Sequence, residues 1–258
     1  MTQPRFATIR LLVLLACLVV VGFTALHQRV YSRNWNQTLE AVVYPINGDD
    51  HLATNSYIQN LNSDDFAIIN RWGEREAERY ALALPTPFKV TLGEQISNLP
   101  PTFPDKANAV KVLIWGLRFR LWAWRNTPDD GGLTRVRMFV VYQTGEDNKA
   151  LQHSLGMQKG LMGLVFAYSL HKQTAQNNII IAHELLHTVG ATDKYNAYGG
   201  PLMGIGYANS NRIPLYPQRN AEIMAGRIPT SSSSSYMAES LRSVVINTYT
   251  ASEINWID

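Results

Sequence analysis

The sequence predicts an α/β protein of the α+β type, in which a mixed sheet is backed by one helix and carries a second, histidine-rich helix. Three features support this fold class. Apolar segments with strand-like alternation are separated by turn residues, an early segment is rich in Glu, Arg and Ala, and the later segment IIIAHELLHTVGATDKY (179–195) has histidines at helical spacing. The 258 residues are 46% hydrophobic, which suffices for one good core or two small ones. The order strand, helix, several strands, helix indicates a layered arrangement with the histidine helix against the sheet.

The first elements are bounded by turn residues and prolines. Residues 39–48 predict a strand that ends in a Pro/Asn/Gly turn, and Ser63-Asp64-Asp65 is typical of a helix start. We expect a helix over 66–84, because its apolar residues recur at helical steps and two prolines follow it. Residues 88–96 predict the next strand.

The middle of the chain shows the strongest alternation. In 110–125, VKVLIWGLRFRLWAWR, every second residue is apolar, which predicts a strand with one core face and one partly solvated face. The turn at 128–132 and the apolar segment 135–144 would complete a hairpin with it. The aromatic and basic face of 110–125 also permits a nucleic-acid platform, but a plain strand is the simpler interpretation.

Strand, helix and loop signals follow in the second half. We expect a strand over 162–170 and a helix from about Ala175 to Val189, with Thr174 as its N-cap. Residues 195–220 are rich in Gly and Pro and predict one long loop, a feature that is usually functional or mobile. A last helix is expected over 236–249, within a small irregular and helical C-terminal part.

The first 33 residues form a separate segment. Ile9–Leu26 is almost wholly apolar and approaches the roughly 20 residues that a membrane helix needs. We expect an uncleaved anchor rather than a cleaved signal peptide, because the best cleavage position, after Ala25, has Phe23 where a small residue belongs. Leu14–Cys17 loosely resembles a lipoprotein box, but the apolar run continues beyond it. The segment before the apolar run is short, which fits a cytoplasmic N-terminus. We therefore expect residues 34–258 to lie outside the cytoplasm of a bacterium, in the periplasm or outside the cell.

Charge and cysteine usage narrow the function classes. Four of the 23 basic residues and no acidic residue lie within 1–33, so the remainder, with 19 basic and 20 acidic residues, is nearly neutral. A body without positive excess argues against a nucleic-acid partner. The one cysteine, Cys17, lies in the apolar segment, which excludes an intramolecular disulfide and a cysteine-switch pro-segment within this chain.

The stretch HELLH (183–187) has the spacing of a metal site. On a helix, His183 and His187 lie one turn apart on the same face and can point their imidazoles at one ion. Glu184 lies about 100° around the helix, where it can act as general base to a metal-activated water. A catalytic zinc site needs a third protein ligand. Gly190 can end the helix in a left-handed turn and bring the carboxylate of Asp193 back to the ion.

The extended stretch HELLHTVGATD (183–193) resembles the zinc motif of the metzincin metallopeptidases, both in its matrixin-like spacing and in the snapalysin-like aspartate at its last position. Metzincins also have a methionine in a tight turn downstream of the motif. Met224, in NAEIMAGRIP (220–229), is the best match, and Met203 is the alternative. Several members of the family have a tyrosine two residues after this methionine, where this chain has Gly226.

The resemblance implies a zinc-dependent endopeptidase acting on a protein or peptide substrate. It implies Zn²⁺ held by His183, His187 and Asp193, with Glu184 as the catalytic base and with Gly190 and Met224 as structural supports. It also implies a metallopeptidase-like domain over 34–258, with an upper sheet and helix part (34–190) and a lower loop and helix part (191–258).

A second hypothesis comes from another class. The chain could be a membrane-anchored binding or assembly protein whose metal site is structural or degenerate. A structural site would be closed by a fourth protein ligand. His171, just before the predicted helix, is the only nearby histidine that could serve. If the chain is instead a peptidase, we expect the edge strand that binds its substrate near 160–168.

Overall fold

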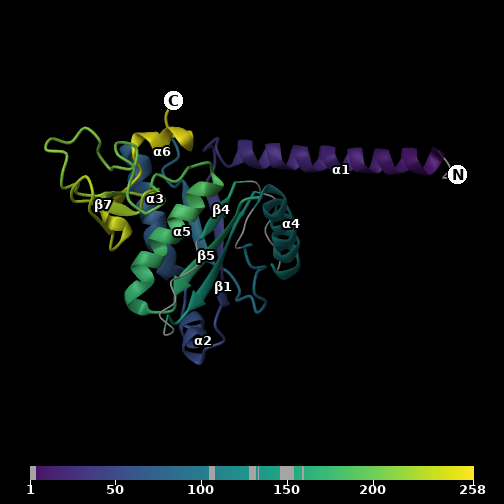
Figure 1. The fold of residues 1–258 in the computed structure, drawn as a ribbon, viewed down its shortest axis with the longest axis horizontal. Coiled ribbons are helices and arrows are strands. Elements are labelled where there is room, and N and C mark those ends of the chain that lie inside the picture. The colour runs from purple at the N-terminus through teal and green to yellow at the C-terminus, as the bar shows by residue number, and fades with distance from the viewer. Residues whose placement is uncertain (1–3, 105–107, 128–131, 133, 146–153, 159) are drawn as a thin grey trace.

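The computed structural model describes residues 4–104, 108–127, 132, 134–145, 154–158 and 160–258. Its centre is a five-stranded mixed sheet with the strand order β2-β1-β3-β5-β4 (Figure 1). The strands are β1 (Leu39–Asn47), β2 (Phe88–Leu92), β3 (Val136–Gln143), β4 (Leu155–Met157) and β5 (Met162–Tyr168). Strands β2, β1, β3 and β5 are parallel, and β4 pairs antiparallel with β5. This arrangement confirms the predicted mixed α+β fold class.

Both faces of the sheet are buried, which explains its nearly continuous apolar strands. On one face, α3 (Ala67–Arg79) and α5 (Thr174–Thr188) pack over the main core. Along β3, Met138 and Val140 contribute to this core, while Phe139 and Val141 belong to a second core on the opposite face. This is the two-residue alternation expected of a strand.

The segment 110–125, predicted as a strand, is a helix. Helix α4 (Ala109–Asn126) begins after Asn108, whose side chain accepts a hydrogen bond from the Lys111 backbone N–H. It covers the second face of the sheet through Trp115, Phe119 and Ala123, which recur every four residues. Strand β3 therefore pairs with β1 and β5 and forms no hairpin with 110–125. The predicted turn at 128–132 lies mostly outside the described residues.

The prediction failed because the outer face of α4 is apolar as well. Without a polar face, the 3.6-residue period of a surface helix does not stand out, and the alternation of single residues dominates the pattern.

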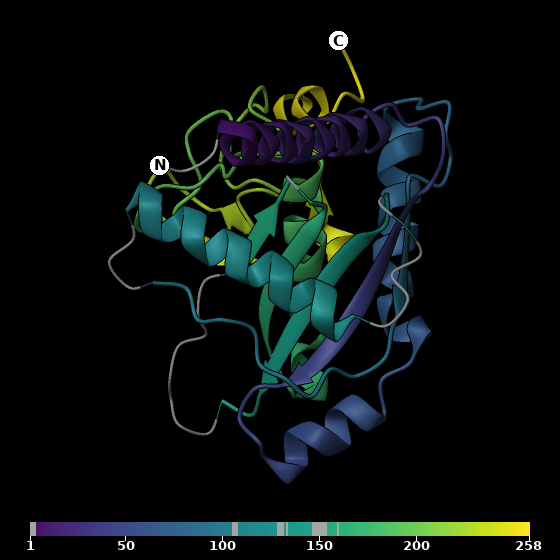
Figure 2. The ribbon, with the colours of Figure 1, turned by 90° about the vertical axis from the view of Figure 1, so that its right-hand side faces the viewer.

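Four further helical segments precede the histidine helix. They are α2 (Leu52–Gln59), which the sequence did not predict, η1 (Ser63–Phe66), η2 (His171–Gln173) and the N-terminal α1 (Pro4–Tyr31). The helix start expected near Ser63 is confirmed, with Asn62 and Asp65 forming a capping box. Helix α1 projects away from the body (Figures 1 and 2) and is long and apolar enough to cross a membrane, a property that a signal sequence shares.

The chain after α5 is largely irregular, as expected for 195–220. It ends in five short elements and one 3₁₀ turn, which are β6 (Ala221–Glu222), β7 (Arg227–Pro229), β8 (Ser235–Met237), η3 (Leu241–Ser243), β9 (Val244–Val245) and α6 (Thr248–Glu253). The helix predicted over 236–249 is wrong. Its residues pair instead with β7 and β6, partners that lie outside the segment and that local propensity does not reveal.

Candidate metal centre

Helix α5 holds the histidines because its other faces are anchored in the core. Ile181, Leu185 and Leu186 are buried in the main core, so the orientation of the helix is fixed. His183 and His187 lie one turn apart, with their Nε2 atoms 3.1 Å from each other. The predicted helix and its histidine pair are therefore present as the sequence indicated.

The helix ends in a Schellman motif. The Gly190 N–H donates to the carbonyl of His187, and the Ala191 N–H donates to the carbonyl of Leu186. Gly190 has φ +109°, a left-handed conformation that favours glycine. The chain thus reverses immediately after the second histidine, as the sequence predicted.

This reversal brings Asp193 to the histidines. Its Oδ1 atom lies 3.1 Å from Nε2 of His183 and 3.1 Å from Nε2 of His187. The two imidazoles are 13% and 16% exposed, so the three atoms gather at a partly open surface rather than deep in the core. Three side chains singled out from the sequence therefore converge at one point.

Main-chain carbonyls fix both imidazole rings. Nδ1 of His183 lies 3.0 Å from the carbonyl oxygen of Ile223, and Nδ1 of His187 lies 2.8 Å from that of Ala191. Since a carbonyl oxygen can only accept, each Nδ1 carries a proton, and in the neutral ring Nε2 is the acceptor. Each Nε2 then presents a lone pair toward the other ring and Asp193.

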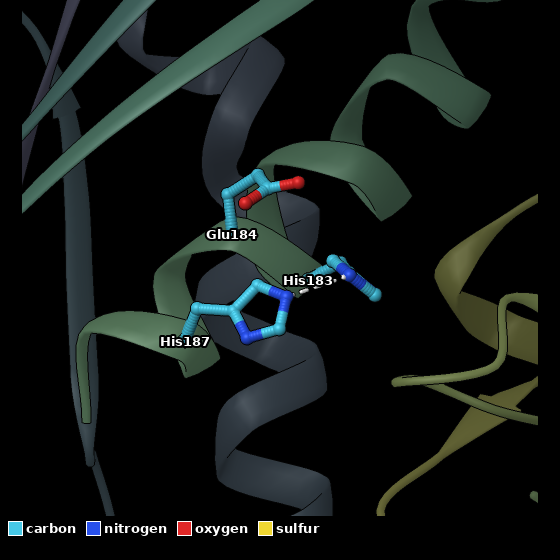
Figure 3. A group of neighbouring side chains, drawn as sticks. All are labelled: His183, Glu184 and His187. Atoms are coloured by element: carbon cyan, nitrogen blue, oxygen red, sulfur yellow. Dashed lines mark hydrogen bonds between the residues drawn. The ribbon is translucent and has the colours of Figure 1, made fainter. Parts of the chain in front are cut away.

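The carboxylate of Glu184 lies beside this group, on the side of the sheet edge (Figure 3). The side chain is buried, and its Oε2 atom has no hydrogen-bond partner. Burial raises the pKa of Glu184, although the neighbouring imidazoles and a hydrogen bond from the Gly156 backbone partly offset this effect. A buried carboxylate with an unpartnered oxygen needs a polar group to complete it.

The electrostatics of the group favour a positive charge. Burial acts to lower the pKa of His183, but its bond to Asp193, the charge of Glu184 and the Ile223 carbonyl outweigh burial and raise it. Burial acts to raise the pKa of Asp193, but the two imidazoles hold it well below its usual range. Both shifts have the same cause, the attraction between an imidazole that carries a positive charge and the ionised carboxylate of Asp193.

The two candidate turn methionines differ in placement. Met224 is fully buried in the main core, whereas Met203 is 78% exposed. Met224 lies in a tight turn, where the N–H groups of Ala225 and Gly226 donate to the carbonyl of Glu222. The same turn supplies the Ile223 carbonyl to His183, so it contacts the candidate metal ligands directly.

Several residues at the site went unpredicted. Buried Lys194 donates to Glu253 Oε2 at 2.6 Å, and Glu253 also accepts from both the N–H and the hydroxyl of Thr192. These bonds tie the residues on either side of Asp193 to α6. Thr192 and Lys194 flank Asp193 in the sequence, which indicates that polar neighbours hold this carboxylate in place. Glu253, which accepts their hydrogen bonds, lies too far along the chain for the sequence to identify it.

Tyr195 also lies at the site. Its ring stacks on His183 with 6.3 Å between the ring centroids. Burial and the neighbouring carboxylates of Asp193 and Glu184 raise the pKa of Tyr195 to about 12, so its hydroxyl stays protonated. Two other tyrosines of the long loop, Tyr207 and Tyr216, are hydrogen-bonded to each other.

The candidate fourth ligand and the predicted edge strand both lie elsewhere in the fold. His171 lies in η2 at the opposite end of α5, with its ring beside Tyr57, and does not join the histidine pair. The edge strand expected near 160–168 is β5, which is internal to the sheet; the edge is β4. In the described part of the chain, His183, Glu184 and His187 form a group that could hold a metal ion.

Comparisons with known proteins add little. No protein-family model matches the chain, and no curated protein matches it significantly. Among solved structures, the chain is similar to one described as "Structure of a chaperone-substrate complex", with 12% sequence identity and a TM-score of 0.34. That match covers 67% of this chain and only 26% of the other. A likeness this weak supports no conclusion about fold or function.

Proposed function

We propose that the chain is a zinc-dependent endopeptidase that a single N-terminal helix anchors in a membrane. One observation carries the proposal. Nε2 of His183, Nε2 of His187 and Oδ1 of Asp193 lie 3.1 Å from one another, and all three are acceptors when the imidazoles are neutral. Three such atoms fit around a common centre about 2 Å from each, which is the length of zinc bonds to nitrogen and oxygen.

The donor set fits zinc among the common metals. Two neutral imidazoles and one carboxylate are the ligands of many catalytic zinc sites, whereas magnesium and calcium prefer oxygen ligands alone. The carbonyls of Ile223 and Ala191 orient the imidazoles in the way that outer-shell partners orient metal ligands. When bound, zinc would polarise a carbonyl group and lower the pKa of water.

Glu184 is placed to move the proton of the reaction. In peptide hydrolysis, the oxygen of a water molecule attacks the carbonyl carbon, the C–N bond breaks, and the leaving nitrogen takes a proton. The unpartnered Oε2 of Glu184 can accept the proton from water and return it to that nitrogen. Its raised pKa makes the carboxylate a stronger base toward water, and the carboxyl group stays acidic enough to return the proton to the leaving nitrogen.

The adjacent edge of the sheet suits a peptide substrate. Strand β4 pairs only with β5 among the described strands, and Gly156 in β4 lies against Glu184 and His187. An extended peptide could add to a free strand edge through main-chain hydrogen bonds. Such a peptide would pass beside the carboxylate that the mechanism needs.

The metzincin resemblance supports the same function. Two observations agree with this resemblance, since Gly190 lies in the turn that ends α5 and Met224 lies in a buried tight turn next to His183. The position of the tyrosine found in several members is Gly226 here, and Tyr195, stacked on His183, is the tyrosine nearest the site. The alternative, a structural metal in a binding protein, needs a fourth ligand, and among the described residues the candidate His171 lies beside Tyr57 and not at the histidine pair.

The apolar length of α1 supports a location at a membrane. We propose that α1 stays attached and holds the body on the extracytoplasmic side. Exposure of the body to protease added to intact spheroplasts tests this orientation. Protection of the body would contradict it.

Cleavage of a generic protein substrate tests the proposed activity. The full chain should digest casein, lose this activity with a chelator and regain it when zinc is restored. Glu184→Gln should keep the metal and lose about 10²-fold or more of the activity, because general acid–base catalysis contributes that much. Equal turnover by wild type and Glu184→Gln would contradict the proposal, and tight metal binding without any cleavage would favour the structural alternative.

A further inference from the structure

Helix α4 has two apolar faces. Trp115, Phe119 and Ala123 form the inner face and pack on the sheet. The opposite face carries a second apolar set, here called the outer stripe, whose six side chains are 46–71% exposed. The outer stripe consists of Val110, Leu113, Ile114, Leu117, Leu121 and Trp124. At about 100° per residue these six positions fall within an arc of about 100°, the width of the buried stripe on an ordinary amphipathic helix.

Basic side chains flank the outer stripe. Lys111, Arg118 and Arg125, seven residues apart, are exposed along one side of it, and Arg120 lies on the other. Helix α4 contains no acidic residue. Lys111 and Arg118 also line a hollow of about 520 Å³ between α4 and the proline-rich segment before it. An exposed apolar stripe with positive flanks is the composition of helices that lie in the interface of a membrane.

The position of α4 relative to α1 points to the same environment. Helix α1 leaves the body on the side that α4 covers (Figure 1). Viewed from that side, α4 lies across the front of the sheet with no other helix over it (Figure 2). The end of α1 is fixed to the body, because Arg33 donates to the carbonyl of Glu253 and to the Asn255 side chain, and the Trp35 indole donates to Ile254.

We propose that α4 is a second membrane contact, an interfacial helix that lies on the bilayer that α1 enters. The outer stripe would lie at the boundary between headgroups and acyl chains, and the basic flanks would contact anionic headgroups. Trp124, at the end of the stripe, is a residue type enriched at this depth. This inference rests on the proposed anchoring by α1 and is independent of the metal centre.

A bilayer fits this face better than a second copy of the chain does. Two α4 helices packed stripe to stripe would bring Lys111, Arg118 and Arg125 of one copy close to those of the other, with no acidic residue on either helix. Anionic lipid brings negative charge to this face instead. Burying six large apolar side chains gives the contact its driving force.

A contact between α4 and the membrane would also set the orientation of the metal centre relative to the bilayer. Helix α5, with His183 and His187, packs on the face of the sheet opposite to α4. With α4 on the membrane, the metal centre stays clear of the lipid and its edge strand β4 remains open to a substrate outside the bilayer. Helix α4 thus fixes a body that α1 alone would leave free to tilt.

Spin labels in the full chain test the proposal. In a Cys17→Ser background, single cysteines at Leu117 on the outer stripe, Leu52 on α2 and Val20 on α1 carry a nitroxide, and the protein is reconstituted into vesicles of phosphatidylcholine and phosphatidylglycerol. All three parent side chains are exposed in the structure. The Leu117 label should resemble the Val20 label, colliding readily with oxygen and several-fold less with an aqueous nickel chelate than the Leu52 label does.

The controls separate the possible failures. A Leu117 label as accessible to the chelate as the Leu52 label, while Val20 stays protected, overturns the inference and leaves the anchor intact. A Val20 label open to the chelate refutes the anchor as well. Dipolar coupling between Leu117 labels at low protein-to-lipid ratio would mean that a second copy covers the stripe, which also overturns it. As a further check, Leu121→Glu with Leu113→Glu should expose the Leu117 label to the chelate while circular dichroism stays unchanged.

Discussion

Nδ1 of His183 lies 3.0 Å from the carbonyl oxygen of Ile223, a residue 40 positions further along the chain. The turn that supplies this oxygen also accepts a hydrogen bond from the Lys194 N–H at the carbonyl of Met224. One tight turn thus holds a histidine of α5 and the residue next to Asp193. The relative position of these two side chains is therefore set by the C-terminal part of the chain and not by α5 alone.

Asp193→Ala should weaken metal binding. The substitution removes one of the three converging acceptors, and loss of a ligand should cost more than the roughly 10–100-fold that the loss of an outer-shell partner costs. Metal content after gel filtration and competition with a chelator of known affinity measure the effect. Asp64→Ala, at an exposed aspartate in η1 that does not contact the histidines, is the matched control. Full metal retention by Asp193→Ala would show that the carboxylate is not a ligand.

Gly156→Ala should damage the site more than the fold. A Cβ at this position would lie 2.4 Å from the Cβ of His187 and 2.5 Å from the carbonyl oxygen of Glu184, so β4 or α5 would have to shift. Such overpacking costs about 1–3 kcal/mol of stability, whereas a displacement of about 1 Å in an active site can cost about 10²-fold in rate. Casein cleavage and urea unfolding separate the two effects.

The control for this prediction is Gly116→Ala in α4, where the nearest atom to an added Cβ is the flexible end of Arg120. This variant should keep full activity and unchanged or higher stability, because alanine favours a helix. Unchanged activity in Gly156→Ala would show that the contact between β4 and α5 does not position the site.

The parts of the site that lie close together in sequence were predictable. The spacing of His183 and His187 predicted that they share one helical face. Gly190 predicted the left-handed turn that brings Asp193 back to them. These features depend on local geometry that the chain encodes within eleven residues. The supports from elsewhere, Ile223 and Gly156, required knowledge of tertiary packing.

The failures have two physical causes. In 110–125, apolar residues on both faces of α4 hid the helical period, because the face that usually turns polar carries the outer stripe instead. In 236–249, Tyr236 and Val244 form strand pairs with Ile228 and Ala221, and the helical pattern was overridden by these pairings. Each of these elements depends on contacts outside its own segment, which the local pattern of residues does not contain.

Lys194→Met should loosen the loop that carries Asp193. The ammonium group of Lys194 is buried, and its bonds to Glu253 and Thr192 would be lost. Glu253 is partly exposed and keeps its bonds from Thr192, so we expect a loss of about 1–3 kcal/mol in the free energy of unfolding, less than for a fully buried pair. Metal affinity should fall with it. The double variant with Glu253→Gln should recover part of the loss, and strict additivity of the two substitutions would argue against coupling.

The stability of the fold should depend on pH through Glu222, at the start of the turn that contains Met224. Its carboxyl accepts hydrogen bonds from the Thr250 hydroxyl and the Met224 N–H. Burial raises the pKa of Glu222 to about 7. It outweighs these hydrogen bonds and the ammonium group of Lys194, which both act to lower the pKa. The folded chain therefore keeps a proton that the unfolded chain loses near pH 4.5.

Because the folded state binds the additional proton, the contribution of Glu222 to stability is fullest below pH 4.5, falls as the pH rises toward 7, and is constant above that. The shift corresponds to roughly 3 kcal/mol between the two ends of this window. Urea unfolding at a series of pH values should show this fall in the wild type and a flatter profile in Glu222→Gln, with zinc held saturating throughout. The exposed Glu239→Gln is the control and should keep the wild-type slope. Parallel profiles for wild type and Glu222→Gln would show that the buried carboxyl does not titrate on unfolding. The turn that supplies the Ile223 carbonyl to His183 would then be independent of pH in this range.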